Sequence, residues 1–231
     1  MNLSVDFNKY CVVIPAFNAG KTISELILKV QNLIPELSII VIDDGSTDNT
    51  ALIVSEFGSV RLYSHKVNRG KGAAVKTGIR IAQKNGFQYA IFIDADLQHD
   101  PGSILEFIKT REQYRCEMIL GCRNIFGTKM PFHRVLSNTI TSFVISIRTG
   151  KVIHDSQCGY RLIALENLNP FLFTNDGFQF ESEFLIKMVY AGKSYQEVSI
   201  PTIYNTSGSS INNVMDTIRF IKIFFLSYFW F

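Results

Sequence analysis

Apolar residues in the first hundred positions follow two alternating patterns. Four short segments are almost continuously apolar and rich in β-branched residues, which is typical of strands buried on both faces of a sheet; they are residues 10–15, 38–42, 60–63 and 89–93. Between these segments, helical spacing of the apolar residues predicts helices over residues 21–33, 49–57 and 70–85. Alternation of strands and helices predicts a parallel sheet covered by helices on both faces.

The second half of the chain continues this pattern less regularly. We expect strands at residues 117–122, 158–164 and 195–200, helices at residues 101–112, 132–147 and 181–190, and a C-terminal helix from residue 212. Ser46 or Thr47 is expected to cap the helix at residues 49–57. Because no internal repeat or linker is evident, we expect one α/β domain over residues 1–211, followed by the C-terminal helix over residues 212–231.

Polar residues follow the carboxyl end of each of the first four predicted strands. They are Asn18, Asp43 with Asp44, Asn68 with Arg69, and Asp94 with Asp96. The carboxyl ends of parallel strands meet at one edge of a sheet, and ligands bind outside that edge. Four independent strand ends with polar residues therefore predict a ligand site there.

Asp94 and Asp96 form the part of this site that points to a specific chemistry. They are separated by one residue, so in an extended backbone both side chains point to the same side. Two close carboxylates repel unless a proton or a cation lies between them, and Mg²⁺ or Mn²⁺ prefers carboxylate, amide and water oxygens. Gln98 can add an amide oxygen. Asp is also common in turns, so the Asp-x-Asp pattern alone does not distinguish a metal site from a turn.

The composition excludes some classes of partner. The 231 residues are 47% hydrophobic and carry a net charge of only +3, which indicates a folded core and argues against a nucleic-acid-binding protein. Residues 118–154 contain no Asp or Glu, so this segment is expected to face an anionic partner or solvent; its cations are Arg123, Lys129, Arg134, Arg148 and Lys151. The four cysteines form no CxxC pair, which favours reduced thiols in a cytosolic protein.

The C-terminal segment has the composition of a helix that lies on a membrane. No segment reaches the run of about 18 to 20 apolar residues that spans a bilayer, and residues 1–9 do not resemble a signal peptide. From Asp216 onward, Arg219 and Lys222 lie among apolar residues, and the segment ends in aromatic residues. Such a helix is expected to lie in the interface between lipid and water, or else to pack on the core or on a dimer partner.

The segment Gly70-Lys71-Gly72 is typical of phosphate-binding loops but fits neither common type. Its second glycine stands where a Walker A loop needs Ser or Thr, and Val75 stands where a dinucleotide fingerprint needs Gly or Ala. ATP- and NAD-binding sites of those types are therefore disfavoured. The pattern favours a diphosphate ester that is held through a divalent metal at the two aspartates and Gln98.

A series of motifs spans residues 12–201. In order they are VVIPAFN at 12–18, DDGSTDNT at 43–50, NRGKGAA at 68–74, DADLQ at 94–98, Arg123, Arg134, Asp155, GYR at 159–161, FESE at 180–183 and EVSIP at 197–201. Together they resemble the family 2 glycosyltransferases, in particular the branch of dolichyl-phosphate mannosyltransferase and related polyprenyl-phosphate glycosyltransferases.

The resemblance implies a GT-A fold, with a Rossmann-like, mostly parallel sheet flanked by helices. It implies inverting transfer of a sugar from GDP-mannose or a UDP-sugar to a lipid-linked phosphate, at the cytoplasmic face of a membrane. The implied nucleotide-sugar-binding residues are Pro15, Ala16, Asn18, Asp43, Asp44, Arg69, Lys71, Asp94 and Ala95. The implied metal ligands are Asp94, Asp96 and Gln98, and the implied catalytic residues are Asp96, Arg123, Arg134 and Glu183, of which the two arginines would hold the acceptor phosphate.

The acceptor decides whether a general base is needed. A phosphate monoester has a second pKa of about 6 and is already mostly dianionic near neutral pH, whereas a sugar hydroxyl requires a base. Glu181 and Glu183 are the candidate bases, although residues two apart on a helix do not face the same way. Arg161 is expected to pair with one of them, and Asp155 to orient a neighbouring arginine.

Three functions therefore stay open. The first is transfer to a polyprenyl phosphate, and the second is transfer to a saccharide hydroxyl in the synthesis of cell-surface polysaccharide. The third is a non-catalytic homologue that binds a nucleotide sugar, because Ile211 stands where the family usually has a lysine. The sequence does not indicate an oligomeric state.

Overall fold

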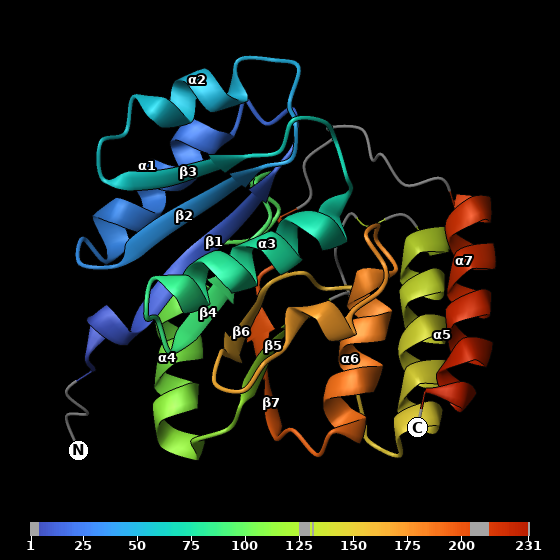
Figure 1. Cartoon of the computed structure of the whole chain (residues 1–231). Helices are drawn as coiled ribbons and strands as arrows, with labels where there is room; N and C mark the ends of the chain where they lie inside the picture. The colour runs from blue at the N-terminus through green and yellow to red at the C-terminus, as the bar shows by residue number, and fades with distance from the viewer. Residues whose placement is uncertain (1–4, 125–129, 131, 204–212, 231) are drawn as a thin grey trace.

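The computed structural model describes residues 5–124, 130, 132–203 and 213–230. Its centre is a seven-stranded sheet with the strand order β3-β2-β1-β4-β6-β5-β7 (Figure 1). The strands are β1 (Tyr10–Ala16), β2 (Ser38–Asp43), β3 (Val60–Ser64), β4 (Tyr89–Phe92), β5 (Met118–Arg123), β6 (Arg161–Ala164) and β7 (Tyr195–Ile200). Each predicted strand is confirmed, with β6 beginning later than expected.

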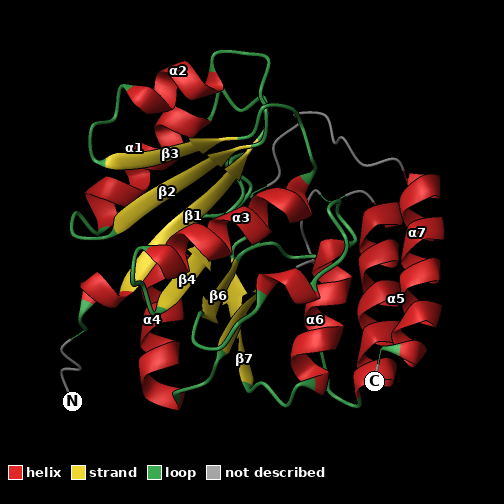
Figure 2. Ribbon diagram, viewed as in Figure 1, coloured by secondary structure: helices red, strands yellow, loops and turns green. Residues whose placement is uncertain are grey.

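Helices cover both faces of this sheet (Figure 2). They are α1 (Ile23–Leu33), α2 (Thr50–Ser55), α3 (Lys71–Lys84), α4 (Ser103–Tyr114), α5 (Phe132–Thr149), α6 (Phe180–Tyr190) and α7 (Asn213–Leu226). Three short 3-10 helices also occur in the described residues: η1 (Phe7–Lys9), η2 (Pro170–Leu172) and η3 (Ser227–Phe229). The helices expected from the apolar spacing are therefore present.

The side chains of β1 explain why its sequence is continuously apolar. Val12 and Ile14 join a core with α1, α2 and α4 on one face of the sheet. Cys11 and Val13 point to the opposite face and join a second core with α3, α5 and α6. Successive residues of a strand point to opposite faces, so a strand covered on both sides has no position for a polar residue.

The first four strands form the parallel half of the sheet. β2 pairs with β1 and β3, and β4 pairs with β1, all in parallel, so their carboxyl ends lie at one edge. β6 is antiparallel to both of its neighbours, β4 and β5. Gly159, just before β6, lies beside Asp94, just after β4. The chain therefore enters β6 from the same edge at which β4 ends, which explains its opposite direction.

The predicted cap of α2 is wrong. Its N-cap is Asn49, whose side chain makes no capping hydrogen bond. Asp48 Oδ1 instead accepts a hydrogen bond from the Thr50 amide at 3.0 Å. Ser46 and Thr47 bind the loop after β1, because the segment between β2 and α2 lies against that loop.

Candidate active site

Hydrogen bonds join the loops after β1 and β2 into one rim. The Asn18 amide donates to Ser46 Oγ at 2.9 Å, and the Thr47 amide donates to Asn18 Oδ1 at 2.9 Å. Asn18 has a φ of 50°, a left-handed conformation that asparagine tolerates better than most residues. Asp43 is buried at the end of β2, and its Oδ1 accepts from the Ser46 amide at 3.1 Å. Asn18 and Asp43, both predicted to bind the nucleotide, thus shape the same rim.

Asp44 fixes the turn that leads into α3. Its carboxylate is buried and accepts hydrogen bonds from the amides of Arg69 at 3.1 Å and Gly70 at 2.7 Å. His65 Nδ1 lies 2.6 Å from the same carboxylate. Asp44, predicted to bind the nucleotide sugar, therefore also positions the backbone around Lys71.

The other predicted nucleotide-binding residues lie along the same edge. Ala16 is buried at the end of β1, next to the partly buried Pro15, and Ala95 is buried between the two aspartates. Arg69 is exposed at the turn before α3. The structure thus brings these residues to the edge that the strand pattern predicted.

A tight turn carries the predicted metal ligands. Asp94 follows β4 and is partly buried, whereas Asp96 is exposed, and the Gln98 amide donates to Asp96 Oδ1 at 3.0 Å. Leu97 has a φ of 60°, a strained conformation for its residue type, and its side chain packs against the core on the α4 face of the sheet. A strained turn held in place by packing is a common feature of functional sites.

The chemistry of this turn fits a hard divalent cation. Although Asp96 is exposed as a residue, the surrounding chain partly desolvates its carboxyl, and this desolvation together with the negative charge of Asp94 raises the pKa of Asp96, as expected for two carboxylates that lie close together. In the part of the chain that the structure describes, no three His, Cys, Asp or Glu side chains form a metal-binding cluster. Two carboxylates with the amide oxygen of Gln98 are a donor set suited to Mg²⁺ or Mn²⁺, with water or substrate oxygens as the remaining ligands.

Lys71 lies between two acidic residues. Its Nζ is 2.7 Å from Asp94 Oδ1, 2.8 Å from Asp94 Oδ2 and 3.3 Å from Glu181 Oε1. Glu181 also forms an ion pair with Arg161, which donates to the Cys158 carbonyl at 2.7 Å. Burial favours the neutral amine, but the charges of Asp94 and Glu181 outweigh it and raise the pKa of Lys71. Lys71 thus contacts the predicted metal site.

Arg123 and Asp155 form the pair that was expected from the sequence. Arg123 Nε donates to Asp155 Oδ2 at 2.7 Å, and Arg123 Nη2 donates to Asp155 Oδ1 at 2.9 Å. The Asp155 side chain is buried, yet its hydrogen bonds and ion pair with Arg123 hold its pKa below the usual range. A two-point contact of this kind fixes the plane of the guanidinium. The N–H groups of Arg123 that do not bind Asp155 therefore point in a fixed direction.

Comparison with known proteins gives this site its chemical class. Residues 11–168 match the family described as glycosyl transferase family 2. The chain belongs to this family. It is therefore a glycosyltransferase, and the prediction that it is an enzyme of this family is confirmed.

Two named relatives extend over most of the chain. The glycosyltransferase is 31% identical over 215 residues to the UDP-N-acetylglucosamine–dolichyl-phosphate N-acetylglucosaminyltransferase of Methanococcus voltae, with 84% of this chain and 85% of the relative covered. It is 24% identical to the polyprenol monophosphomannose synthase of Mycolicibacterium smegmatis, with 88% of this chain and 83% of the relative covered. The predicted resemblance to the polyprenyl-phosphate branch is thereby confirmed.

A solved structure has the same fold. The glucosyl-3-phosphoglycerate synthase of Mycobacterium tuberculosis, crystallised with Mn²⁺, UDP and phosphoglyceric acid, matches with a TM-score of 0.72 and 18% identity. The match covers 94% of this chain and 77% of that chain. At this identity the likeness concerns the fold alone, and it confirms the predicted GT-A type of sheet flanked by helices.

The carboxylate of Glu183 is buried and binds the loop before α6. Its completely buried carboxylate accepts hydrogen bonds from the amides of Thr174 and Asn175 and from both of their side chains, at 2.8 to 3.0 Å. Lys187 Nζ lies 2.5 Å from Glu183 Oε1. Burial opposes ionisation, but these donors lower the pKa of Glu183. The geometry gives Glu183 a role in holding the loop before α6 and does not support it as a general base.

Two further predictions concern the acceptor side. Arg134 lies on the first turn of α5, is partly exposed, and forms no ion pair with a carboxylate of the described residues. Ile211 and the loop at 204–210 lie outside the described residues. The role of Arg134 in binding an acceptor phosphate, implied by the family resemblance, therefore stays a prediction.

Two residues of the site were assigned no role from the sequence. His99 is buried with its Nε2 3.9 Å from Asp94 Oδ2, and its ring packs against Tyr160 at a centroid distance of 5.3 Å. A Cβ on Gly159 would lie 2.5 Å from Lys71 Nζ and 2.8 Å from Asp94 Oδ2, so a larger residue there would push this ion pair out of its present position. The signal for His99 was its position directly after Gln98, whereas the contact of Gly159 depends on the antiparallel entry into β6.

Proposed function

We propose that this glycosyltransferase moves a sugar, with inversion, from a nucleotide sugar to a polyprenyl phosphate, with the help of Mg²⁺ or Mn²⁺. The names of two relatives support the acceptor class, because one acts on dolichyl phosphate and the other is a polyprenol monophosphomannose synthase. The donor set at Asp94, Asp96 and Gln98 supports the use of a metal.

The main support for this proposal is that the buried carboxylates near the site are held in hydrogen bonds and ion pairs. Glu183 has its oxygens occupied by the loop before α6, Glu181 is paired with Lys71 and Arg161, and Asp155 is paired with Arg123. A saccharide hydroxyl needs a base to remove its proton, whereas a phosphate monoester is already ionised near neutral pH, with a second pKa of about 6. Carboxylates held in ion pairs favour an acceptor that needs no base.

Each part of the site then has a role in transfer. A bound metal would neutralise charge on the diphosphate that leaves from the sugar. Lys71 adds a positive charge at the same point, and the rim formed by Asn18 and Asp43 borders the place of the nucleoside. Asp155 orients Arg123 toward the acceptor phosphate, and Arg134 adds a second cation. Positioning and charge balance are what this reaction requires of the protein.

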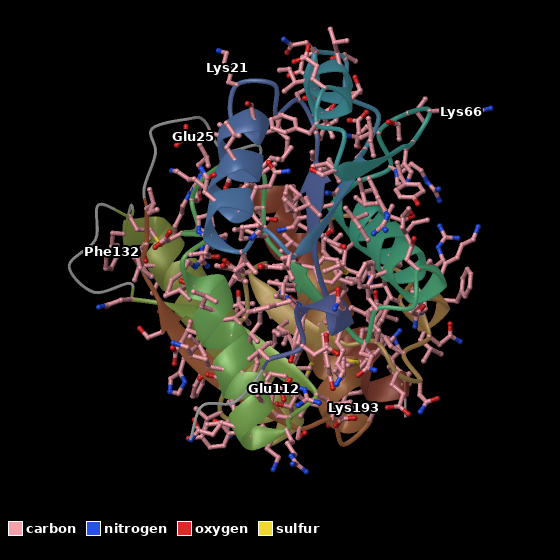
Figure 3. The ribbon with its side chains drawn as sticks, turned by 90° about the vertical axis from the view of Figure 1, so that its left-hand side faces the viewer. Lys21, Glu25, Lys66, Glu112, Phe132 and Lys193 are labelled. Atoms are coloured by element: carbon pink, nitrogen blue, oxygen red, sulfur yellow. The ribbon has the colours of Figure 1, made fainter. Side chains whose placement is uncertain are left out.

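Exposed apolar residues on α5 support contact with a lipid surface. Five of them recur at helical spacing along one side of this helix, between 47% and 78% exposed; they are Phe132, Leu136, Ile140, Phe143 and Ile147. Figure 3 shows Phe132 on the outside of the molecule at the start of α5. None of the described helices is both long and apolar enough to cross a bilayer. A helix with such a stripe is suited to lie in the interface between lipid and water.

The C-terminal segment also exposes apolar residues. α5 and α7 are neighbours (Figure 1), and Arg148 at the end of α5 donates to Ser227 Oγ at 2.9 Å. Phe225 and Phe229 are 62% and 84% exposed, whereas Ile223 and Ser227 are buried against the rest of the chain. The C-terminal segment therefore packs on the domain with one side and exposes aromatic residues on the other. We place this glycosyltransferase at the cytoplasmic face of a membrane, where its lipid-linked acceptor is accessible.

A labelled-donor assay tests the proposal. The full chain is incubated with Mn²⁺, radiolabelled GDP-mannose or UDP-sugars, and either polyprenyl phosphate or an oligosaccharide. The proposal predicts label that is extracted with the lipid. Label in the oligosaccharide would contradict it in favour of a hydroxyl acceptor, and nucleotide binding without turnover of any donor would contradict it in favour of a non-catalytic homologue.

A further inference from the structure

The ammonium of Lys71 is paired with Asp94, the carboxylate that a metal at this site requires. Its Nζ contacts both oxygens of Asp94, at 2.7 and 2.8 Å, and lies 3.3 Å from Glu181. Asp94 is thereby neutralised from within the protein. A divalent cation that binds Asp94 must compete with this ammonium for the same two oxygens.

The backbone that carries Lys71 is fixed, so only its side chain can move away. Asp44 accepts hydrogen bonds from the amides of Arg69 and Gly70, directly before Lys71. The Ala73 amide, in the same helical turn, donates to the Asp176 carbonyl at 3.1 Å. Lysine has a long side chain with several rotatable bonds, so its charged end can change partner while its Cα stays in place.

A nucleoside diphosphate offers Lys71 a new anionic partner. When the diphosphate approaches the edge, the ammonium can leave Asp94 for a phosphate oxygen, and Asp94 becomes free to bind the metal. We propose that Lys71 is a displaceable cation that closes the metal site of the free enzyme and couples metal binding to donor binding. This inference rests on the proposed metal site at Asp94, Asp96 and Gln98.

Such coupling has a measurable consequence in both directions. If the diphosphate raises the affinity for the metal, the metal raises the affinity for the diphosphate by the same factor. Coupling between sites in proteins is typically about 5-fold to 150-fold. Removal of the ammonium should therefore strengthen binding of the metal alone and reduce the effect of the nucleotide on it.

Titration calorimetry with Mn²⁺ tests this inference on the full chain, alone and with saturating UDP or GDP. In Lys71→Met we expect Mn²⁺ alone to bind about 10-fold tighter than in the wild type, and the enhancement by the nucleotide to fall, since the typical coupling is of this order. Lys76→Met is the matched control, because Lys76 lies on the same helix and pairs with Asp176 at 2.6 Å instead of Asp94. This control should bind Mn²⁺ as the wild type does.

Two results would overturn the inference. If Lys71→Met binds Mn²⁺ alone no tighter than the wild type, the ammonium does not compete with the metal. If the wild type binds no Mn²⁺ even with either nucleotide, the metal site itself fails, and the proposed use of a metal fails with it. A thermal melt checks that Lys71→Met is folded, and Lys71→Gln, which keeps a hydrogen-bond donor for Asp94, replaces it if it is not.

Discussion

At the scale of single residues, the site is built from charges that neutralise one another. Asp94, Lys71, Glu181 and Arg161 alternate in sign along one chain of contacts. Removing one member of a buried pair leaves its partner unpaired and costs about 3–5 kcal/mol. For variants at this site, the loss of activity must therefore be measured together with the loss of stability.

Glu183→Gln separates a structural role from a catalytic one. Because its carboxylate is fully buried and lies 2.5 Å from Lys187, we expect this variant to lose about 3–5 kcal/mol of stability. Turnover per folded molecule should stay within a few-fold of the wild type, as measured by thermal unfolding and kcat. A large loss of kcat without a loss of stability would identify Glu183 as a base.

The pH dependence of stability gives a second measurement on the same residue. The folded protein lowers the pKa of Glu183, so the unfolded state binds more protons as the pH falls toward the ordinary glutamate value of about 4.3. The contribution of Glu183 is therefore complete above that value and is lost as the pH falls through the folded-state pKa. In Glu183→Gln this part of the acid sensitivity should disappear.

Asp96→Asn tests the predicted metal ligand. Asp96 is exposed, so the loss of its charge should leave the melting temperature nearly unchanged. Loss of one carboxylate from the metal site should reduce Mn²⁺-dependent transfer by at least about 100-fold, the effect of removing a main electrostatic stabiliser of a transition state. Asp6→Asn is the control, because Asp6 lies before β1 at the opposite edge of the sheet. Retained activity in Asp96→Asn would exclude this ligand.

Residue-level predictions succeeded where both partners belong to the motifs read from the sequence and were expected to pair. The pairing of Arg161 with one of the glutamates of α6 and of Asp155 with an arginine was predicted and is present. The contact of Lys71 with Asp94 was not predicted, because it joins the start of α3 to the end of β4 and depends on the space left by Gly159. Such contacts are set by how elements pack, which no spacing along the chain indicates.

Among the helices, α5 stands out because it exposes a stripe of apolar residues where the surface of a water-soluble protein is usually polar. Its stripe of exposed apolar residues is defined by Phe132, Leu136, Ile140, Phe143 and Ile147. The sequence predicted the helix but directed the membrane prediction to the C-terminal segment. No membrane contact was predicted for α5, because periodicity shows that apolar residues share a face of a helix but not whether that face is covered.

Phe143→Glu tests contact of α5 with lipid. Insertion of a phenylalanine side chain contributes about 1.5–3 kcal/mol, so the variant should bind anionic vesicles roughly 10-fold to 100-fold more weakly in a co-sedimentation assay. Leu52→Glu is the matched control, because Leu52 on α2 is equally exposed, at 64%. Equal binding of Phe143→Glu and the control would contradict a role of α5 at the membrane. Deletion from Asp216 onward is a weaker test, because it also removes the packing of Ile223 and Ser227.

At the scale of the whole molecule, the fold follows from the alternation of strands and helices. Four parallel strands with polar residues at their carboxyl ends were sufficient to predict the edge at which the site lies. The antiparallel insertion of β6 between β4 and β5 was not predicted, because a short apolar segment carries no signal of its direction. This insertion brings Gly159 and Arg161 to the site. The sequence therefore predicted the part of the site at the parallel strands better than the part next to β6.

In the proposed function the acceptor is already ionised and needs no base from the protein. The most direct test compares polyprenyl phosphate with the corresponding free polyprenol, under identical conditions with labelled donor and Mn²⁺. Because the carboxylates Glu181, Glu183 and Asp155 are held in internal pairs, we predict label in the lipid extract with the phosphate and none above background with the alcohol. Comparable transfer to the free alcohol would show that the protein supplies a base and would exclude the proposed function.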